Sequence, residues 1–281
     1  MRRLVNGLIA VALGLYIALI VLALFSDRLL FQAQSSSYQD KDLIEAAEGQ
    51  GIKDARVLKL ASSSYANGKK HVAPATITAL YLPNPTAKFT LLFSHGNAED
   101  IGADLPLLDI YRRAGFSVLA YDFRGYGTSE GRSTEASVYA DAEAAYAGLT
   151  GELGVPQSQV ISMGRSLGSA AAIHIAVTHP VAGLVVEAPF VSAFRVLTRV
   201  QLLPWDKFNN ALKIRQVKVP VLVIQGDADE VVPFRQGQKI FELANDPKQK
   251  LWVHGAHHND VLFTGTQKYL AALREFANGL R

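Results

Sequence analysis

The sequence contains no cysteine. This absence excludes a disulfide framework, a thiolate nucleophile and a cysteine-based metal site, although it does not fix the compartment in which the protein works. An excess of one charge is also missing, because 28 basic residues face 25 acidic ones and the formal net charge is +3. No basic-aromatic pattern accompanies this small excess, so the composition does not favour nucleic-acid binding. We therefore expect no nucleic-acid partner.

One segment, residues 4–25, lacks charged residues entirely. As a helix it would reach roughly 33 Å, enough to cross the hydrocarbon core of a bilayer. The alternative is a cleaved signal peptide, but the residues after position 24 do not form a small-residue cleavage site. We predict that residues 1–30 form an uncleaved single-pass membrane anchor. Because Arg2 and Arg3 precede the apolar run, the positive-inside rule predicts a cytoplasmic N-terminus, with the remainder on the outer (periplasmic or extracytoplasmic) side.

After a polar spacer at residues 31–53, apolar strand patterns alternate with amphipathic helix patterns through residues 54–281. Strands are predicted at 56–60, 75–82, 89–93, 118–121, 160–163, 183–186, 219–224 and 250–253, and helices at 105–113, 133–149, 234–244 and 267–279. This alternation predicts one α/β domain with a mostly parallel sheet covered by helices on both faces.

Residues 189–219 are too many for a plain connection, so they are predicted to form a small lid over the site. The lid is rich in basic residues, and a helix at 190–203 would place Arg195 and Arg199 opposite an apolar face. Two interpretations stay open: the charges lie in water over a packed apolar face, or this segment docks on anionic lipid headgroups.

The pentapeptide Gly-x-Ser-x-Gly, with its serine at Ser166, lies between a buried-strand pattern and an alanine-rich helix pattern. This sequence is typical of a nucleophile elbow, the sharp turn that raises a serine hydroxyl above a sheet, although it also occurs in ordinary turns. The backbone N–H of Leu167, directly after the serine, is a predicted donor to an oxyanion. The second predicted donor is the N–H of Asn97, in the loop after the first parallel strand.

Three acids follow the predicted strand 219–224, where a carboxylate could orient a catalytic histidine. Asp229 best fits the Gly-x-x-Asp spacing, while Asp227 and Glu230 remain alternatives. We expect two of these three acids to be solvated or to brace the loop.

A cluster of histidines follows the last predicted strand, so a general base from this loop would complete the order Ser, Asp, His. His257 and His258 are both candidates. A rival interpretation, a metal site made of His254, His258 and Asp260, would leave the serine without a base.

Two further polar groups are expected to be structural. The imidazole of His95 is predicted to hold its own loop rather than to act as a base. Asp122 and Arg124 could pair across a glycine-rich loop and brace it.

Residues 56–281 resemble the α/β-hydrolase superfamily. The motifs that carry the resemblance are Ser-His-Gly-Asn-Ala at 94–98, Asp-Phe-Arg-Gly-Tyr-Gly at 122–127, Gly-Arg-Ser-Leu-Gly at 164–168, Gly-Asp-Ala-Asp-Glu-Val-Val-Pro at 226–233 and His-His-Asn-Asp at 257–260. They are most similar to small membrane-anchored serine hydrolases related to the abhydrolase-domain protein depalmitoylases.

That resemblance implies an α/β-hydrolase fold, a Ser166–Asp229–His258 triad and cleavage of an ester, thioester or amide in a small-molecule or lipid-like acyl substrate. It implies no metal and no organic cofactor. His257 stands where relatives carry a small residue, and His258 is preferred because Asn-Asp follows it directly, as in relatives. An acyltransferase, a peptidase or a non-catalytic membrane scaffold on the same fold are the alternatives.

Overall fold

The computed structural model describes residues 2–24, 27–34, 36–65, 70–198 and 205–280. Its strands are β1 (Arg56–Tyr65), β2 (Lys70–Leu82), β3 (Thr90–Ser94), β4 (Ser117–Tyr121), β5 (Val160–Arg165), β6 (Gly183–Glu187), β7 (Val221–Gly226) and β8 (Lys248–Val253). Its α-helices are α1 (Arg2–Leu24), α2 (Asp27–Leu30), α3 (Asp40–Gly49), α4 (Leu105–Arg113), α5 (Glu135–Ala147), α6 (Gly168–Thr178), α7 (Ala193–Thr198), α8 (Asn210–Lys213), α9 (Phe234–Leu243), α10 (Val261–Thr264) and α11 (Thr266–Asn278).

The strands form one sheet in the order β1-β2-β4-β3-β5-β6-β7-β8. β2 runs antiparallel to both β1 and β4, and the strands from β4 to β8 across the sheet pair in parallel. β3, β4, β6 and β7 are buried along their whole length, which explains why they appear in the sequence as continuous apolar runs rather than alternating ones. The predicted mostly parallel α/β sheet is confirmed.

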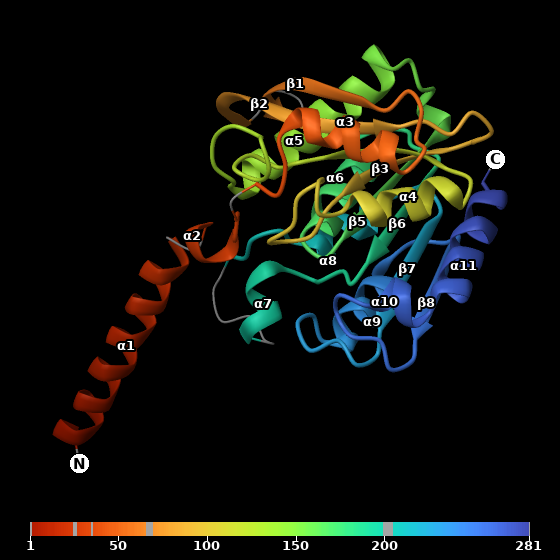
Figure 1. Cartoon of the computed structure of the whole chain (residues 1–281). Helices are drawn as coiled ribbons and strands as arrows, with labels where there is room; N and C mark the ends of the chain where they lie inside the picture. Colours follow the sequence, from red (N-terminus) through yellow and green to blue (C-terminus); the bar gives the residue numbers. More distant parts are fainter. Residues whose placement is uncertain (1, 25–26, 35, 66–69, 199–204, 281) are drawn as a thin grey trace.

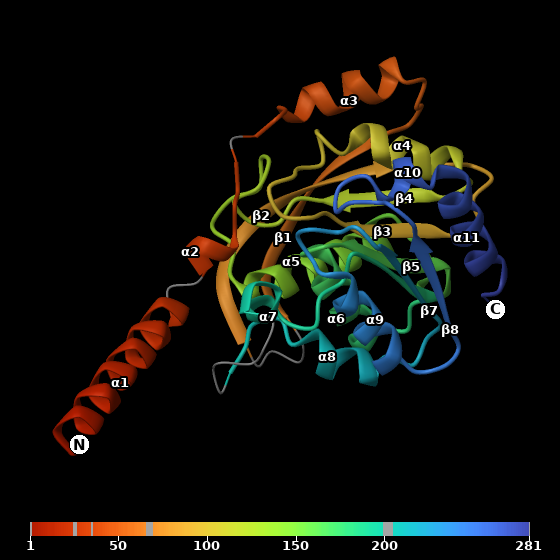
Figure 2. The same ribbon diagram turned by 90° about the horizontal axis from the view of Figure 1, so that it is seen from below.

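Helices cover both faces of this sheet (Figures 1 and 2). Buried side chains of α5, α6 and α9 pack in one core cluster, and those of α3, α4 and α11 pack in the other. α6 presents small residues, mostly alanines, to the sheet, which allows the helix to lie close to β5. This close approach positions the turn between β5 and α6.

The N-terminal region differs from the expectation. α1 projects away from the domain in Figure 1. In the described part of the chain, no helix combines the length and apolar character needed to cross a bilayer. The fold therefore does not support the predicted transmembrane helix.

The spacer, in contrast, packs on the domain. Leu43 and Ala47 of α3 are buried in the core cluster that includes α4. The Ser37 backbone N–H donates to Asp100 Oδ2 at 2.7 Å, and the Tyr38 hydroxyl donates to Asp122.

The expected pair between Asp122 and Arg124 is wrong, because each side chain has other partners. Arg124 Nε lies 2.8 Å from Asp141 Oδ1, and its guanidinium also donates to Ser62. Asp122 accepts from the Ile101 N–H at 2.9 Å and from Tyr38. Arg124 braces its loop against α5 instead.

In the described part of the lid segment, the predicted helix 190–203 corresponds to α7. α7 covers only Ala193–Thr198, and residues 199–204, with Arg199, lie outside the described residues. Arg195 lies 3.6 Å from Asp206, and Lys207 pairs with Asp27. Lys213 lies over the Tyr139 ring at 3.3 Å. These three basic side chains therefore interact with the protein itself.

Asp104, at the start of α4, is a buried carboxyl whose Oδ2 has no hydrogen-bond partner among the described residues. Burial, followed by the charges of Asp122, Asp100 and Glu187, raises its pKa to about 7. The folded protein therefore holds this proton more tightly than the unfolded chain, whose carboxyl has a pKa near 3.8. The resulting stability is fully present below the unfolded pKa and is lost as the pH rises towards 7.

We predict that Asp104→Asn stabilises the protein more at pH 8 than at pH 5. At pH 8 the wild type carries a buried negative charge at Asp104, whereas at pH 5 this carboxyl is still mostly protonated in the folded protein. The extra stabilisation should be roughly 1–3 kcal/mol, or several degrees in Tm. Thermal unfolding at the two pH values measures it, with exposed Asp54→Asn as the control. An Asp104→Asn effect of equal size at both pH values would contradict the prediction.

Candidate active site

Ser166 lies in the turn between β5 and α6, and its backbone is left-handed with φ of 50°. Its N–H donates to Glu187 O at 2.9 Å, which ties the turn to β6. A Cβ at Gly164 would lie 2.1 Å from Gly168 O, and one at Gly168 would lie 2.0 Å from Ser94 O. Both contacts are with backbone, so only glycine fits these positions. The strained, glycine-flanked serine has the local structure of a nucleophile elbow.

A line of hydrogen bonds runs from this serine through a histidine to an aspartate. His258 Nε2 lies 3.0 Å from Ser166 Oγ, and His258 Nδ1 lies 2.8 Å from Asp229 Oδ2. The structure thus brings together the three residues that the resemblance implied. With the proton on Nδ1 donated to the carboxylate, Nε2 is free to accept the serine proton.

Asp229 is held in a fixed orientation in the loop after β7. Its Oδ1 accepts the N–H groups of Val231 and Val232 at 2.9 and 2.8 Å, and its Oδ2 accepts from Gln225 at 2.7 Å. Its side chain is completely buried. The carboxylate that faces His258 is therefore both desolvated and fully hydrogen-bonded.

The two alternative acids, Asp227 and Glu230, pair with histidines other than His258. Asp227 Oδ2 lies 2.8 Å from His254 Nδ1, and Glu230 Oε2 lies 3.1 Å from His257 Nδ1. The His257 side chain is 58% exposed, against 9% for His258. Within the described ranges, no group of three or more His, Asp or Glu side chains could hold a metal ion.

The two predicted oxyanion donors, Asn97 and Leu167, both line the cavity beside Ser166. Among the described residues neither backbone N–H donates a hydrogen bond within the protein. Ala98, directly after Asn97, has φ of 60°, so this loop is also tightly turned. Both N–H groups are therefore available to an acceptor in the cavity.

His95 stabilises the loop after β3 that contains Asn97. Its Nδ1 lies 2.7 Å from Gly96 O, and its ring packs against Phe123 and Tyr126. Burial lowers its pKa to about 4, so the ring is neutral near pH 7. This is the structural role expected from the sequence.

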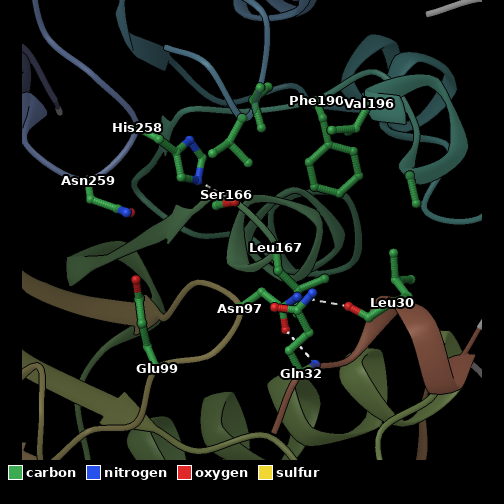
Figure 3. Close-up of a pocket in the computed structure, with 13 residues that line it drawn as sticks. Leu30, Gln32, Asn97, Glu99, Ser166, Leu167, Phe190, Val196, His258 and Asn259 are labelled. Atoms are coloured by element: carbon green, nitrogen blue, oxygen red, sulfur yellow. Dashed lines mark hydrogen bonds between the residues drawn. The ribbon is translucent and has the colours of Figure 1, made fainter. Parts of the chain in front are cut away.

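The cavity has a volume of about 370 Å³ and is mostly apolar. Ser166 and His258 lie in its wall (Figure 3). Its apolar lining comes from Leu30, Leu167, Phe190, Ala193, Val196, Val231 and Val232. The arrangement can bind an apolar group next to a serine hydroxyl that has a base.

Sequence reasoning missed the contacts of Glu99 and Arg165, and it missed that Leu30 and Gln32 lie in the cavity wall. Glu99 accepts the Gly96 N–H at 2.8 Å and pairs with Arg165, which precedes the serine. Arg165 lies inside the Gly-Arg-Ser-Leu-Gly motif and Glu99 directly follows the Ser-His-Gly-Asn-Ala motif, but neither had an assigned partner. Leu30 and Gln32 line the cavity although they lie at the junction of the predicted anchor and spacer, where no motif marks them.

The fold and the site together define a class of protein. A serine elbow follows β5, an acid loop follows β7 and a histidine loop follows β8 of one mostly parallel sheet. This order of nucleophile, acid and base is the one found on the α/β-hydrolase sheet. The chain belongs to the α/β-hydrolase superfamily and is a hydrolase of the serine-hydrolase type.

Particular relatives support this assignment. Residues 85–212 match the family described as "Serine aminopeptidase, S33". The chain is 38% identical over 198 residues to alpha/beta hydrolase domain-containing protein 17B of Homo sapiens, covering 69% of this chain and 68% of that protein. It is 40% identical over 197 residues to alpha/beta hydrolase domain-containing protein aho-3 of Caenorhabditis elegans, covering 69% and 59%.

Solved structures show the same fold. The Pyrococcus furiosus esterase Pf2001 aligns with a TM-score of 0.67 at 17% identity, over 89% of this chain and 98% of that one. DcsB in complex with a substrate analogue aligns with a TM-score of 0.64 at 17% identity, over 81% and 100%. At this identity the likeness concerns the fold alone.

We predict that Gly168→Ala disrupts the site, because its Cβ would clash with the Ser94 backbone, which no side-chain rotation relieves. The expected result is a loss of several kcal/mol of stability, or no folded protein. The matched control is Gly151→Ala, where a Cβ would meet nothing within 4 Å. Thermal unfolding compares the two variants, and a Gly168→Ala protein as stable as Gly151→Ala would contradict the close approach.

Proposed function

We propose that this protein is a serine acyl hydrolase that cleaves an ester, thioester or amide through an acyl-enzyme. The observation that carries the proposal is the hydrogen-bonded line Ser166–His258–Asp229, which opens into an apolar cavity. A serine hydroxyl is a weak nucleophile near neutral pH, and a hydrogen-bonded imidazole activates it.

The reaction follows from the positions of these groups. Ser166 Oγ attacks the acyl carbon while His258 Nε2 takes its proton, and Asp229 stabilises the resulting imidazolium. The oxyanion accepts hydrogen bonds from the Asn97 and Leu167 N–H groups, each worth on the order of 3 kcal/mol of barrier. His258 then protonates the leaving group. A water molecule, deprotonated by the same imidazole, releases the acid from the serine.

The cavity also bears on the alternatives. An aminopeptidase, the activity named in the family description, requires an acceptor for the free amino group of its substrate. Glu99 is a carboxylate in the cavity wall, but Arg165 and the Gly96 N–H already engage it. The largely apolar lining favours an acyl chain instead.

The lid is part of this proposal. Phe190, Ala193 and Val196, within the segment 189–219, line the cavity beside Ser166. We take this segment as the cover of the acyl site.

We predict that Ser166→Ala and His258→Ala each lower ester turnover by at least about a thousandfold, because the triad members act as a unit. His257→Ala removes an exposed imidazole outside the hydrogen-bonded line and should retain most activity. Hydrolysis of p-nitrophenyl butyrate measures the turnover of each variant, and labelling by a fluorophosphonate probe measures the reactivity of its serine. Labelling that survives Ser166→Ala would exclude Ser166 as the nucleophile. An inactive His257→Ala together with an active His258→Ala would assign the base to His257.

No described helix by itself has the length and apolar character of a membrane span. We nevertheless propose, from the sequence of residues 1–30, that this segment attaches the hydrolase to a membrane as a single-pass anchor. Apolar side chains that are 41–68% exposed occur along its length, at Val5, Leu8, Ile9, Val11, Leu13, Leu15, Tyr16, Ile17 and Val21. These positions are distributed around the whole helix, and a helix that is apolar on all sides is stable only in apolar surroundings. Arg2 and Arg3 favour a cytoplasmic N-terminus and a hydrolase domain on the outer side.

We predict that the full-length chain sediments with membranes after washes with high salt and with alkaline carbonate, and that deletion of residues 2–24 releases it. Immunoblotting of the fractions measures this. Protease added to intact cells or spheroplasts should reach the hydrolase domain if the proposed orientation is correct. Release of the full-length chain by carbonate would contradict a spanning anchor, and a mature N-terminus after residue 24 would identify a signal peptide.

A further inference from the structure

The segment 27–34, which follows α1, lies against the active site although it is far from the nucleophile in sequence. Leu30 and Gln32 line the same cavity as Ser166. We propose that this segment is one wall of the acyl-binding cavity and that Leu30 sets the length of acyl chain the enzyme accepts. This inference rests on the proposed acyl hydrolase function.

The segment is fixed to the loop that carries a predicted oxyanion donor. Asn97 Nδ2 donates to Leu30 O at 2.8 Å, and the Gln32 N–H donates to Asn97 Oδ1 at 3.0 Å (Figure 3). The Tyr126 hydroxyl donates to the same Oδ1 at 2.5 Å. One amide side chain therefore holds the backbone of the segment on both sides of Phe31.

Two further contacts hold the segment against the lid region. Lys207 pairs with Asp27, and both side chains are partly buried. The Phe31 ring packs edge-on against the fully buried Phe208 ring, with centroids 6.1 Å apart. A loose linker between an anchor and a domain would make none of these contacts, so the segment is a built part of the domain.

Leu30 lies on the apolar side of the cavity. Figure 3 shows Leu30 and Phe190 on the side of Ser166 that faces away from His258. Phe190 and Val196 of the lid segment line the same cavity. An acyl chain leaving the Ser166 carbonyl in this direction would pass between the lid segment and the N-terminal segment.

The effect of Leu30 on chain length can be sized. Burial of one methylene group is worth about 0.8 kcal/mol, or about fourfold in kcat/KM. A larger side chain at Leu30 would remove room for several methylenes, and a smaller one would add room.

The test is the chain-length profile of full-length variants purified in detergent, measured with p-nitrophenyl esters from acetyl to lauroyl. We expect Leu30→Trp to lower kcat/KM for the long esters at least about tenfold more than kcat/KM for the acetyl ester. Leu30→Ala should shift the optimum towards longer chains. Leu212→Trp is the matched control, because Leu212 on α8 is 61% exposed and lies outside the cavity lining.

Fluorophosphonate labelling of each variant reports whether the site is intact, so that a misfolded Leu30→Trp is recognised and Leu30→Ala then decides. Profiles of Leu30→Ala and of a labelled Leu30→Trp that match the wild type would overturn this inference alone. A folded wild type that neither hydrolyses any ester nor reacts with the probe would overturn the proposed function and this inference with it.

Discussion

The active site depends on one close approach of backbone to backbone. α6 begins directly beneath the end of β3, and Gly168 leaves no room between its own Cα and the Ser94 carbonyl. This contact fixes the start of the helix and, with it, the left-handed backbone of Ser166. Asn97, in the loop after β3, and Leu167 line the same cavity. A single packing constraint thus positions both Ser166 and Leu167 at the start of α6.

Two buried carboxyl groups lie near His258, and Asp229 is the one that is hydrogen-bonded to it. Asp229 is satisfied by three hydrogen-bond donors besides His258. Glu187 lies at the end of β6, fully buried, and its carboxyl accepts from the Tyr269 hydroxyl at 2.5 Å. Burial raises the pKa of Glu187, although the nearby Arg165 opposes the rise.

Sequence patterns predicted the parts of this structure that depend on local chemistry. The parallel strands are continuous apolar runs, and the elbow needs glycine at two fixed positions, so both can be recognised from a few adjacent residues. The choice among Asp227, Asp229 and Glu230 was harder, because each acid follows the same strand and each lies near a histidine. The structure separates them by burial: only Asp229 points inward, while the other two pair with exposed histidines. The partners of Arg124 could not be predicted either, since Asp141 and Ser62 come from distant elements.

The division of the N-terminal region shows the limit of composition as a guide to domains. A loss of hydropathy after residue 25 suggested an anchor followed by a spacer, because composition detects what a segment is made of and not what it contacts. The residues at that boundary nevertheless complete the cavity, and the following Ser37 and Tyr38 bind the buried carboxylates of Asp100 and Asp122. Residues of the predicted spacer therefore make packing and hydrogen-bond contacts with the domain predicted to begin at residue 54. If α1 lies in a bilayer, as proposed, the cavity wall at Leu30 and Gln32 is close to the point where the chain leaves it. A substrate taken from the membrane would then meet this wall before it reaches Ser166.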